Sequence, residues 1–189
     1  MCGRYYIPED DAPYQLQSII DALSRRNAPV QQGEVCPGGA IPVVANSRSL
    51  KPTPFAMHWG YRLGGRLVIN ARSETADAKP LFADGMARRR CLIPAVCYYE
   101  WEQTPQGKRK HAIRPAEGDM FYMAGLYRPE PGGAACTILT RSPAPEIAFI
   151  HDRMPVILPQ AALADWLDPR IPAADVLRAA GQPLRHAPA

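Results

Sequence analysis

The sequence predicts an α+β protein that forms a single compact domain over residues 1–189. The 21 prolines are spread along the whole chain, which favours many short elements over long helices. Short apolar runs bounded by turn-forming residues dominate the middle of the chain, as is typical of strands. Helical periodicity is clearest near the two ends, so strands should form the centre and helices the periphery. A chain of 189 residues can bury a sizeable core.

The first element should be a helix over residues 11–26. Leu16, Ile19, Ile20 and Leu23 recur at the spacing that places them on one helical face. Beyond this helix, short runs of apolar residues alternate with Gly and Pro. They predict strands at residues 41–45, 54–59 and 66–70.

Residues 91–102 should form a strand pair or one bent strand, interrupted at Pro94. Turn-forming residues at 104–107 and 129–133 separate the elements that follow. The further strands are expected at residues 111–114, 120–127, 136–140 and 152–158.

The tail from 160 to 181 should be helical, because Leu163, Trp166 and Leu167 fall on one helical face. No comparable pattern continues from Gln182 onward. The last residues are therefore expected to be frayed.

The composition of the chain restricts the classes of function that the protein can have. The net charge of +4 and the pI near 8.9 permit an anionic partner such as nucleic acid without requiring one. The five cysteines have irregular spacing and form no C-x-x-C pair, which argues against a structural zinc site. Neither a signal peptide nor a membrane-spanning apolar stretch is visible, so the expected location is the cytoplasm, with reduced thiols.

Cys2 carries the most informative chemistry, because removal of Met1 would make it the first residue. Its thiol and free α-amine would then form a 1,2-aminothiol, which no internal cysteine offers. The amine condenses with an aldehyde to give an imine, and the thiol then closes a thiazolidine ring. The thiol could instead attack a carbonyl, with the amine as its base. The alternative is a cysteine that stands near the start by chance.

Polar residues gather at the end of a predicted strand, in segment 70–75. Asn70 could hold an amine or an oxyanion by hydrogen bonds, and Arg72 could hold a phosphate. Equally, the segment could begin a helix, with Ser73 as its cap and Glu74 in the first turn.

Glu100 belongs to a segment, residues 97–102, that alternates as a strand does. Glu100 should share one face with Tyr98, while Tyr99 and Trp101 share the other. A carboxylate in an aromatic, partly desolvated surrounding suits general acid–base catalysis. On an edge strand, the same carboxylate would simply face water.

His151 stands between two apolar segments, where a histidine can transfer protons near neutral pH. A buried histidine with a purely structural role is the alternative. Trp59 precedes Gly60 and could stack on a nucleic-acid base, since aromatic stacking holds single strands without reading sequence. The alternative for Trp59 is a place in the core.

These segments occur with others in an order that points to one family. The chain contains Cys2-Gly3-Arg4, Trp59-Gly60, Asn70–Thr75, Arg90–Pro94, Tyr99-Glu100-Trp101, Ala124–Tyr127 and His151–Pro155. Together they resemble the SOS-response-associated peptidase (SRAP) family of abasic-site processing proteins. The resemblance covers roughly residues 2–167, the expected core of the domain, and the helical tail to residue 181 follows it.

The resemblance implies a strand-rich, barrel-like core and a basic groove for single-stranded DNA containing abasic sites. It implies that Cys2, exposed by loss of Met1, bonds covalently to the ring-opened abasic aldehyde as a thiazolidine. Associated lyase and N-terminal self-processing peptidase activities are also implied. Asn70 matches the asparagine that holds the Cys2 amine, and Glu100 matches the acid–base carboxylate. His151 matches the histidine that assists ring opening and proton transfer.

Further positions match residues that lie along the DNA in this family. They are Arg4, Trp59, Arg72, Trp101, Thr140 and Arg153. The arginines match residues near the DNA backbone, the tryptophans match aromatics that line the groove, and the threonine stands at a site position. No cofactor, metal or membrane is expected, and the protein should be a monomer.

Two other functions remain open at this point. The start Met-Cys-Gly is also found in glutamine amidotransferases, whose N-terminal cysteine attacks an amide with its own amine as base. No convincing glutamine-binding set accompanies it in this chain. The second alternative is a non-catalytic protein that shields single-stranded DNA by charge and stacking.

Overall fold

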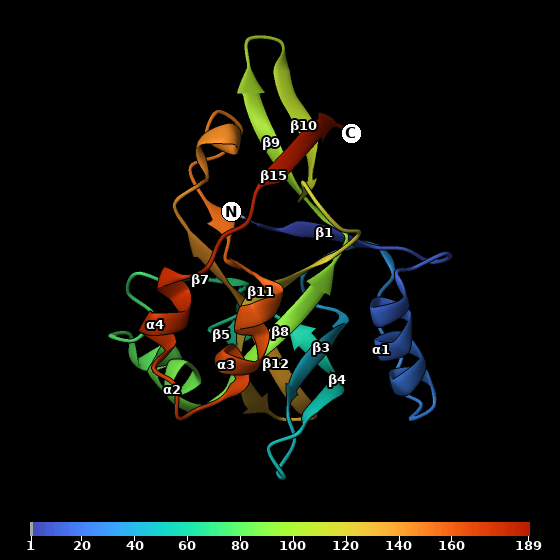
Figure 1. The fold of residues 1–189 in the computed structure, drawn as a ribbon, viewed down its shortest axis with the longest axis vertical. Helices are drawn as coiled ribbons and strands as arrows, with labels where there is room; N and C mark the ends of the chain where they lie inside the picture. Colours follow the sequence, from blue (N-terminus) through green and yellow to red (C-terminus); the bar gives the residue numbers. More distant parts are fainter. Residues whose placement is uncertain (1) are drawn as a thin grey trace.

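The computed structural model of the protein describes residues 2–189. Its central strands are β3 (Ala40–Asn46), β4 (Pro52–Trp59), β8 (Arg90–Ala95), β11 (Phe121–Glu130) and β12 (Gly133–Arg141). They close into a barrel in the order β12-β4-β3-β8-β11, because β11 pairs again with β12 (Figure 1). The β12–β4 pairing is parallel, whereas the other four pairings of the ring are antiparallel. The predicted α+β class with a barrel-like core is confirmed.

A second sheet lies next to the barrel, where β1 contacts β8. Its strands are β1 (Arg4–Ile7), β2 (Gly33–Val35), β9 (Cys97–Thr104), β10 (Gly107–Pro115) and β15 (Leu184–Pro188). They follow the order β15-β10-β9-β1-β2 and are all antiparallel. The β9–β10 hairpin projects from one end of the molecule (Figure 1). Because β9 is central to this sheet and β1 is its neighbour, Glu100 and the start of the chain come to the same region.

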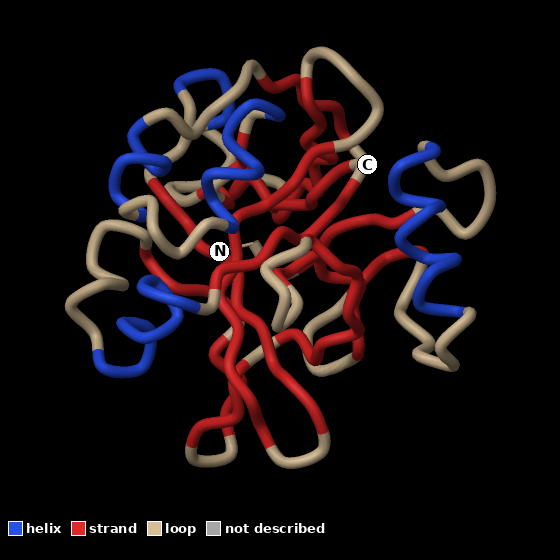
Figure 2. The backbone as a smooth tube through the Cα atoms, turned by 60° about the horizontal axis from the view of Figure 1, so that its bottom comes forward, coloured by secondary structure: helices blue, strands red, loops and turns tan. Residues whose placement is uncertain are grey.

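Both faces of the barrel wall are buried. Along β8, Ile93 belongs to the inner apolar cluster and Leu92 to the outer one, as alternation along a strand requires. The outer cluster is covered by α2 (Pro80–Arg88), α3 (Leu163–Leu167) and α4 (Ala173–Arg178). The helices accordingly flank a body of strands (Figure 2). No helix within residues 2–189 combines the length and apolar character needed to cross a membrane.

Helix α1 (Tyr14–Ser24) confirms the first predicted element. Its four periodic apolar residues are all buried, and the helix packs against β3 and β4. It begins after Pro13 rather than at residue 11. Asp11 has a φ of 53°, which is outside the helical range and explains the later start.

Five shorter strands accompany the central ones. β5 (Tyr61–Leu63) and β6 (Arg66–Val68) form a separate hairpin outside the barrel sheet. Within the barrel sheet, β7 (Asn70–Arg72) pairs in parallel with β12. β13 (Met154–Pro155) pairs with β12, and β14 (Ile157–Leu158) pairs with β11. The strand predicted at 66–70 is therefore two strands, and Asn70 starts the second of them.

Trp166 links the C-terminal helices to the barrel. Its ring is fully buried, its Nε1–H donates to the Cys91 carbonyl oxygen at 2.9 Å, and the Arg90 guanidinium lies 5.2 Å from its centroid. We expect Trp166→Ala to lower the free energy of unfolding by about 3–5 kcal/mol, since the deletion leaves a large cavity. Urea denaturation measures this effect. Trp101→Ala, at a partly exposed position, should cost much less, and equal losses would contradict the proposed anchoring.

Residues 91–102 form two strands, which is one of the two predicted arrangements. The predicted position of the break between them, Pro94, was wrong. Pro94 lies inside β8, and the chain turns at Val96 between β8 and β9. Pro94 faces Tyr122 in the β8–β11 ladder. Its lack of an N–H is tolerated because β8 pairs with β3 over only Val44 and Ala45, away from this position.

The prediction for the end of the chain was wrong. Residues beyond Gln182 are not frayed, because β15 pairs with β10 from Leu184 opposite Pro115 to Pro188 opposite His111. The segment has no apolar period of its own, and the free edge of β10 supplies the partner. The helical tail is also interrupted: α3 and α4 are separated by residues 168–172.

Candidate functional site

Cys2 lies two residues before the start of β1 and is fully buried. Burial raises the pKa of its thiol above the ordinary value, and the nearby Glu100 carboxylate raises it further. Two buried phenol groups, those of Tyr5 and Tyr98, also lie close enough to interact electrostatically with this thiol. The thiol therefore keeps its proton at neutral pH in this setting.

Glu100 projects from β9 into the same buried region. Glu100 is 3% exposed, and Tyr98 on the same face is fully buried. Tyr99 and Trp101 on the opposite face are partly exposed. The predicted alternation is confirmed, and the carboxylate lies on the buried face rather than in water.

His151 faces Glu100 from a different segment. It lies four residues after the end of the 3-10 turn Pro145–Ile147, and its Nε2 lies 4.0 Å from Glu100 Oε2. The backbone N–H of Arg153 donates to His151 Nδ1 at 3.0 Å, and Asp152 Oδ1 lies 2.8 Å from the same nitrogen. The Arg153 bond needs a lone pair on Nδ1, whereas a bond to Asp152 needs a proton there, so the two are alternatives. With the Arg153 bond, the neutral ring carries its proton on Nε2, the nitrogen nearer Glu100.

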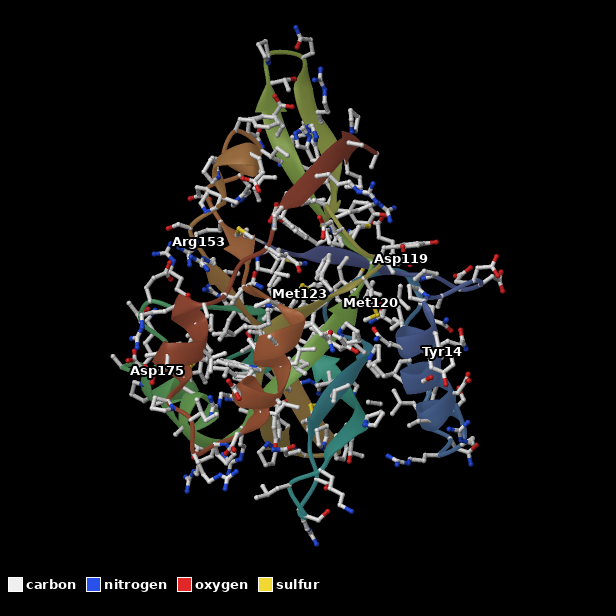
Figure 3. The ribbon with its side chains drawn as sticks, viewed as in Figure 1. Tyr14, Asp119, Met120, Met123, Arg153 and Asp175 are labelled. Carbon is white, nitrogen blue, oxygen red and sulfur yellow. The ribbon has the colours of Figure 1, made fainter. Side chains whose placement is uncertain are left out.

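Arg153 is held in place by several hydrogen bonds. Its two terminal nitrogens donate to the two carboxylate oxygens of Glu74, each at 2.7 Å. Nη2 also donates to the Thr140 carbonyl oxygen at 2.7 Å. In Figure 3, Arg153 lies on the side of the molecule opposite Tyr14 and Asp119. The guanidinium is thus pre-oriented and not free to swing.

A cavity of about 380 Å³ brings four of the predicted site residues together. They are Asn70, Arg72, Thr140 and Arg153, joined in the lining by Lys79 and by apolar side chains. Both polar atoms of the Asn70 amide are buried and have no hydrogen-bond partner within residues 2–189. A buried amide without partners is costly, so these atoms are suited to a ligand that enters the site.

The two groups of residues are adjacent. Cys2, Glu100 and His151 form one group, and the four residues of the cavity form the other. The bond from the Arg153 backbone to His151 joins them. Within residues 2–189, no group of three or more His, Cys, Asp or Glu side chains is placed to hold a metal ion.

Two residues that were predicted to contact DNA are buried instead. Trp59 is fully buried, donates from Nε1 to the Ile69 carbonyl oxygen at 3.1 Å and packs at a tilt against Tyr5, with ring centroids 5.2 Å apart. It is a core residue, so the stacking role expected for it is wrong in this structure. Thr140 is 1% exposed and its hydroxyl donates to the Ala71 carbonyl oxygen, so it supports the cavity wall instead of reaching the DNA backbone.

The remaining predicted contacts lie at the surface. Arg72 is exposed and forms no ion pair within the described residues, while Trp101 is partly exposed. The guanidinium of Arg4 is partly exposed and bonds to Glu34. These side chains can contact a ligand without any rearrangement of the core.

Sequence reasoning overlooked three residues of the site. Glu74 orients Arg153, Lys79 lines the cavity, and Tyr98 places its hydroxyl near Cys2 and Glu100. Burial, Cys2 and Glu100 raise the pKa of the Tyr98 phenol. The alternation of residues 97–102 already placed Tyr98 beside Glu100, whereas nothing local pointed to Lys79.

The ion pair between Glu74 and Arg153 predicts a pH-dependent stability. Hydrogen bonds from Arg153 lower the pKa of Glu74 to about 2 from its ordinary value of 4.5. The stabilisation is therefore present above pH 4.5 and is lost as the pH falls toward 2. Because the side chain of Glu74 is 46% exposed, we expect about 1 kcal/mol in all.

Urea denaturation of wild type and Glu74→Gln over this pH range measures the effect. The variant should lose this part of the pH dependence, and an unchanged profile would count against the pair. Glu117→Gln, at an exposed carboxylate outside this ion pair, is the control for the loss of a negative charge.

Comparison with known proteins identifies the family. Residues 1–188 match the SOS response associated peptidase (SRAP) family. The protein named abasic site processing protein YoqW, from Bacillus subtilis, is 39% identical over 97% of this chain and 87% of its own length. YoaM of the same organism, with the same description, is 31% identical over 94% of this chain and 84% of its own length.

Solved structures share the fold. A protein from Bacteroides thetaiotaomicron has a TM-score of 0.82 at 19% identity, covering 99% of this chain and 91% of that chain. A protein from Bordetella bronchiseptica has a TM-score of 0.78 at 23% identity, covering 100% of this chain and 99% of that chain. The sequence match over nearly the whole length decides the assignment: the chain belongs to the SOS response associated peptidase (SRAP) family.

Proposed function

We propose that this protein processes abasic sites in single-stranded DNA by bonding covalently to them through Cys2. The observation that carries the proposal is the group formed by the buried Cys2 and Glu100 and the partly exposed His151, next to a cavity lined by arginines. The names of the relatives agree with it, since YoqW and YoaM are described as abasic site processing proteins. Removal of Met1, which lies outside the described residues, is part of the proposal because it creates the free α-amine.

The first bond forms between the Cys2 nitrogen and the aldehyde carbon of the opened sugar. The neutral amine attacks, and its reference pKa near 8 leaves part of it unprotonated at physiological pH. The resulting carbinolamine loses its hydroxyl as water after protonation, which leaves an imine. Glu100 or His151 supplies that proton, and the same acid assists the opening of the hemiacetal ring.

The second bond closes the ring. The Cys2 sulfur adds to the imine carbon, and its proton passes to the imine nitrogen, so the thiazolidine forms with the loss of one water overall. A thiol with a raised pKa suits this order, because it stays protonated until the imine exists. It is unsuited to the amidohydrolase alternative, in which a thiolate must attack first.

The imine also explains an associated lyase activity. A base can remove a proton from the carbon next to the imine, after which the bond to the 3′ phosphate oxygen breaks. Self-processing would supply the N-terminus by hydrolysing the peptide bond ahead of Cys2. Both activities follow from the same residues and need no cofactor in this proposal.

The cavity next to this group would hold the DNA around the lesion. Asn70 offers an amide donor and acceptor to the Cys2 amine or the new ring, and Arg72 offers an exposed cation to a phosphate. Trp101 and Arg4 lie on the solvent-facing side of β9 and β1 and extend this surface.

Arg72→Ala should weaken binding to all single strands, whatever their sequence. The slope of log K against log salt should become shallower by about 0.7, the value for one lost phosphate contact on a single strand. Fluorescence anisotropy at several salt concentrations measures both. Arg25→Ala, at an exposed arginine at the end of α1, should change neither. An unaltered slope for Arg72→Ala would exclude the phosphate contact.

Intact-mass spectrometry tests the proposal as a whole. Purified protein is measured before and after incubation with a single-stranded oligonucleotide that carries one abasic site. Loss of Met1 and a stable adduct of one protein per oligonucleotide are expected. A protein that has lost Met1 but forms no adduct would refute covalent processing and leave plain DNA binding.

A further inference from the structure

Glu34 bonds to two cations on the solvent-facing side of the second sheet. Arg4 Nη1 donates to Glu34 Oε1, and Lys110 Nζ donates to Glu34 Oε2. All three side chains are partly exposed, at 43%, 26% and 33% for Arg4, Lys110 and Glu34. The two bonds lower the pKa of the Glu34 carboxylate, with Lys110 as the larger cause. Glu34 is therefore a charged carboxylate held at the surface by two cations from separate strands.

Lys110 reaches Glu34 across two strands. In the sheet order β10-β9-β1-β2, both β9 and β1 lie between them. The Lys110 ammonium lies 3.9 Å from the centroid of the Tyr99 ring and 5.8 Å from that of Trp101. The lysine side chain thus lies over the aromatic face and directs its charge toward Glu34.

We propose that Arg4 and Lys110 form a binding site for one backbone phosphate of the single-stranded DNA, and that Glu34 occupies this site in the free protein. A carboxylate offers an oxygen pair much as a phosphate does, and the Arg4 guanidinium is suited to both. The inference rests on the proposed function, in which Arg4 faces the DNA backbone. Lys110 and Glu34 are the residues it adds.

The position of the site fits the strand that reaches Cys2. Arg4 is two residues after Cys2, so their backbones are about 7 Å apart along an extended chain. Tyr99 stands opposite Arg4, and Trp101 stands opposite Lys110. Cations beside partly exposed aromatic rings are the combination that holds single strands, by charge on the backbone and stacking of the bases.

Exchange of Glu34 for a phosphate is feasible because exposed ion pairs are weak and form in competition with water. The exchange nevertheless releases a carboxylate next to an incoming anion. Glu34 should accordingly lower the affinity for DNA and make its salt dependence shallower, since two cations must first give up their internal partner.

The test begins with Glu34→Gln and an oligonucleotide without an abasic site, so that equilibrium binding is measured apart from any reaction. We expect the affinity to rise about fivefold and the salt slope to steepen. Glu130→Gln removes one negative charge from a carboxylate bonded to Arg128 on β11, in the barrel sheet, and is the matched control. A rise no larger than that of the control would overturn the competition by Glu34.

Lys110→Gln decides whether the lysine contacts DNA or only holds Glu34. It should weaken binding severalfold and reduce the salt slope by about 0.7 when introduced into Glu34→Gln. If Lys110 served Glu34 alone, its loss in that background would change nothing, and the proposed site would be refuted. Lys108→Gln, on the same strand and exposed, is the control. Thermal unfolding of each variant shows that the fold is retained.

Failure of the covalent chemistry is recognised separately. Adduct formation with abasic DNA is followed by intact mass in the same variants. If no adduct forms but the binding changes occur, the phosphate site is supported and only the covalent function is refuted. If adducts form but Glu34→Gln binds DNA as the control does, only the phosphate site is refuted.

Discussion

The Cys2→Ala variant is expected to form no covalent adduct with abasic single-stranded DNA, while the wild type converts to a one-to-one adduct. The variant can still offer an α-amine after loss of Met1, but it has no thiol to close the thiazolidine. An imine alone hydrolyses in water, so a product that survives denaturation should be absent. Denaturing gels and intact mass measure the yield.

Cys36→Ala is the matched control for this prediction. Cys36 is the one cysteine within residues 2–189 that is not buried, so it is the thiol that a nonspecific reaction would use. This variant should form the adduct as the wild type does. A stable adduct in Cys2→Ala, or its loss in Cys36→Ala, would contradict the assignment of the reactive residue.

Affinity for DNA should survive the Cys2→Ala substitution. The thiol is buried and carries no charge at neutral pH, so it adds nothing to the electrostatic attraction of the phosphates. Binding to an oligonucleotide without an abasic site should therefore equal that of the wild type. A variant that protects abasic DNA from cleavage as well as the wild type does would favour simple shielding as the function.

Glu100→Gln is expected to slow adduct formation by about 10²–10⁴-fold, the usual contribution of a general acid or base. The substitution keeps the shape of the side chain and removes both its charge and its ability to donate or accept a proton. DNA affinity should stay the same, because the buried Glu100 side chain cannot contact a phosphate at the surface. Single-turnover rates with excess protein separate the chemical step from binding.

Glu102→Gln provides a closely matched control two residues along β9. Glu102 lies 2.9 Å from His111 Nε2 and is not part of the Cys2 group. This variant should react at nearly the wild-type rate. Equal rates for wild type and Glu100→Gln would remove Glu100 from the mechanism and leave His151 as the proton donor.

Much of the fold was predictable because its elements carry local patterns. Periodic leucines and isoleucines marked α1, and alternation marked β9 with Tyr98 and Glu100 on the buried side. Such patterns report which face of an element is buried. They do not report what covers that face, so Trp59 could be placed either in the core or against a base until its neighbours were known.

Other features had no local signal. The strand β15 exists because the edge of β10 offers unpaired backbone groups, and its own sequence, Leu184–Pro188, would be irregular elsewhere. The bonds of Arg153 to Glu74 and of Lys110 to Glu34 join residues far apart in the chain. Contacts of this kind depend on strand order, which residue spacing does not contain.

The sequence by itself determined the family, the α+β class, most of the elements and the residues suited to the chemistry, with a cysteine at position 2 first among them. Only the tertiary structure decided which of these residues meet. The closure of the barrel through β12 and the pairing of β9 with β1 bring Cys2, Glu100 and His151 together and bury Trp59 and Thr140. Local physics selects helices and strands, whereas burial and long-range backbone pairing select the neighbours of each side chain.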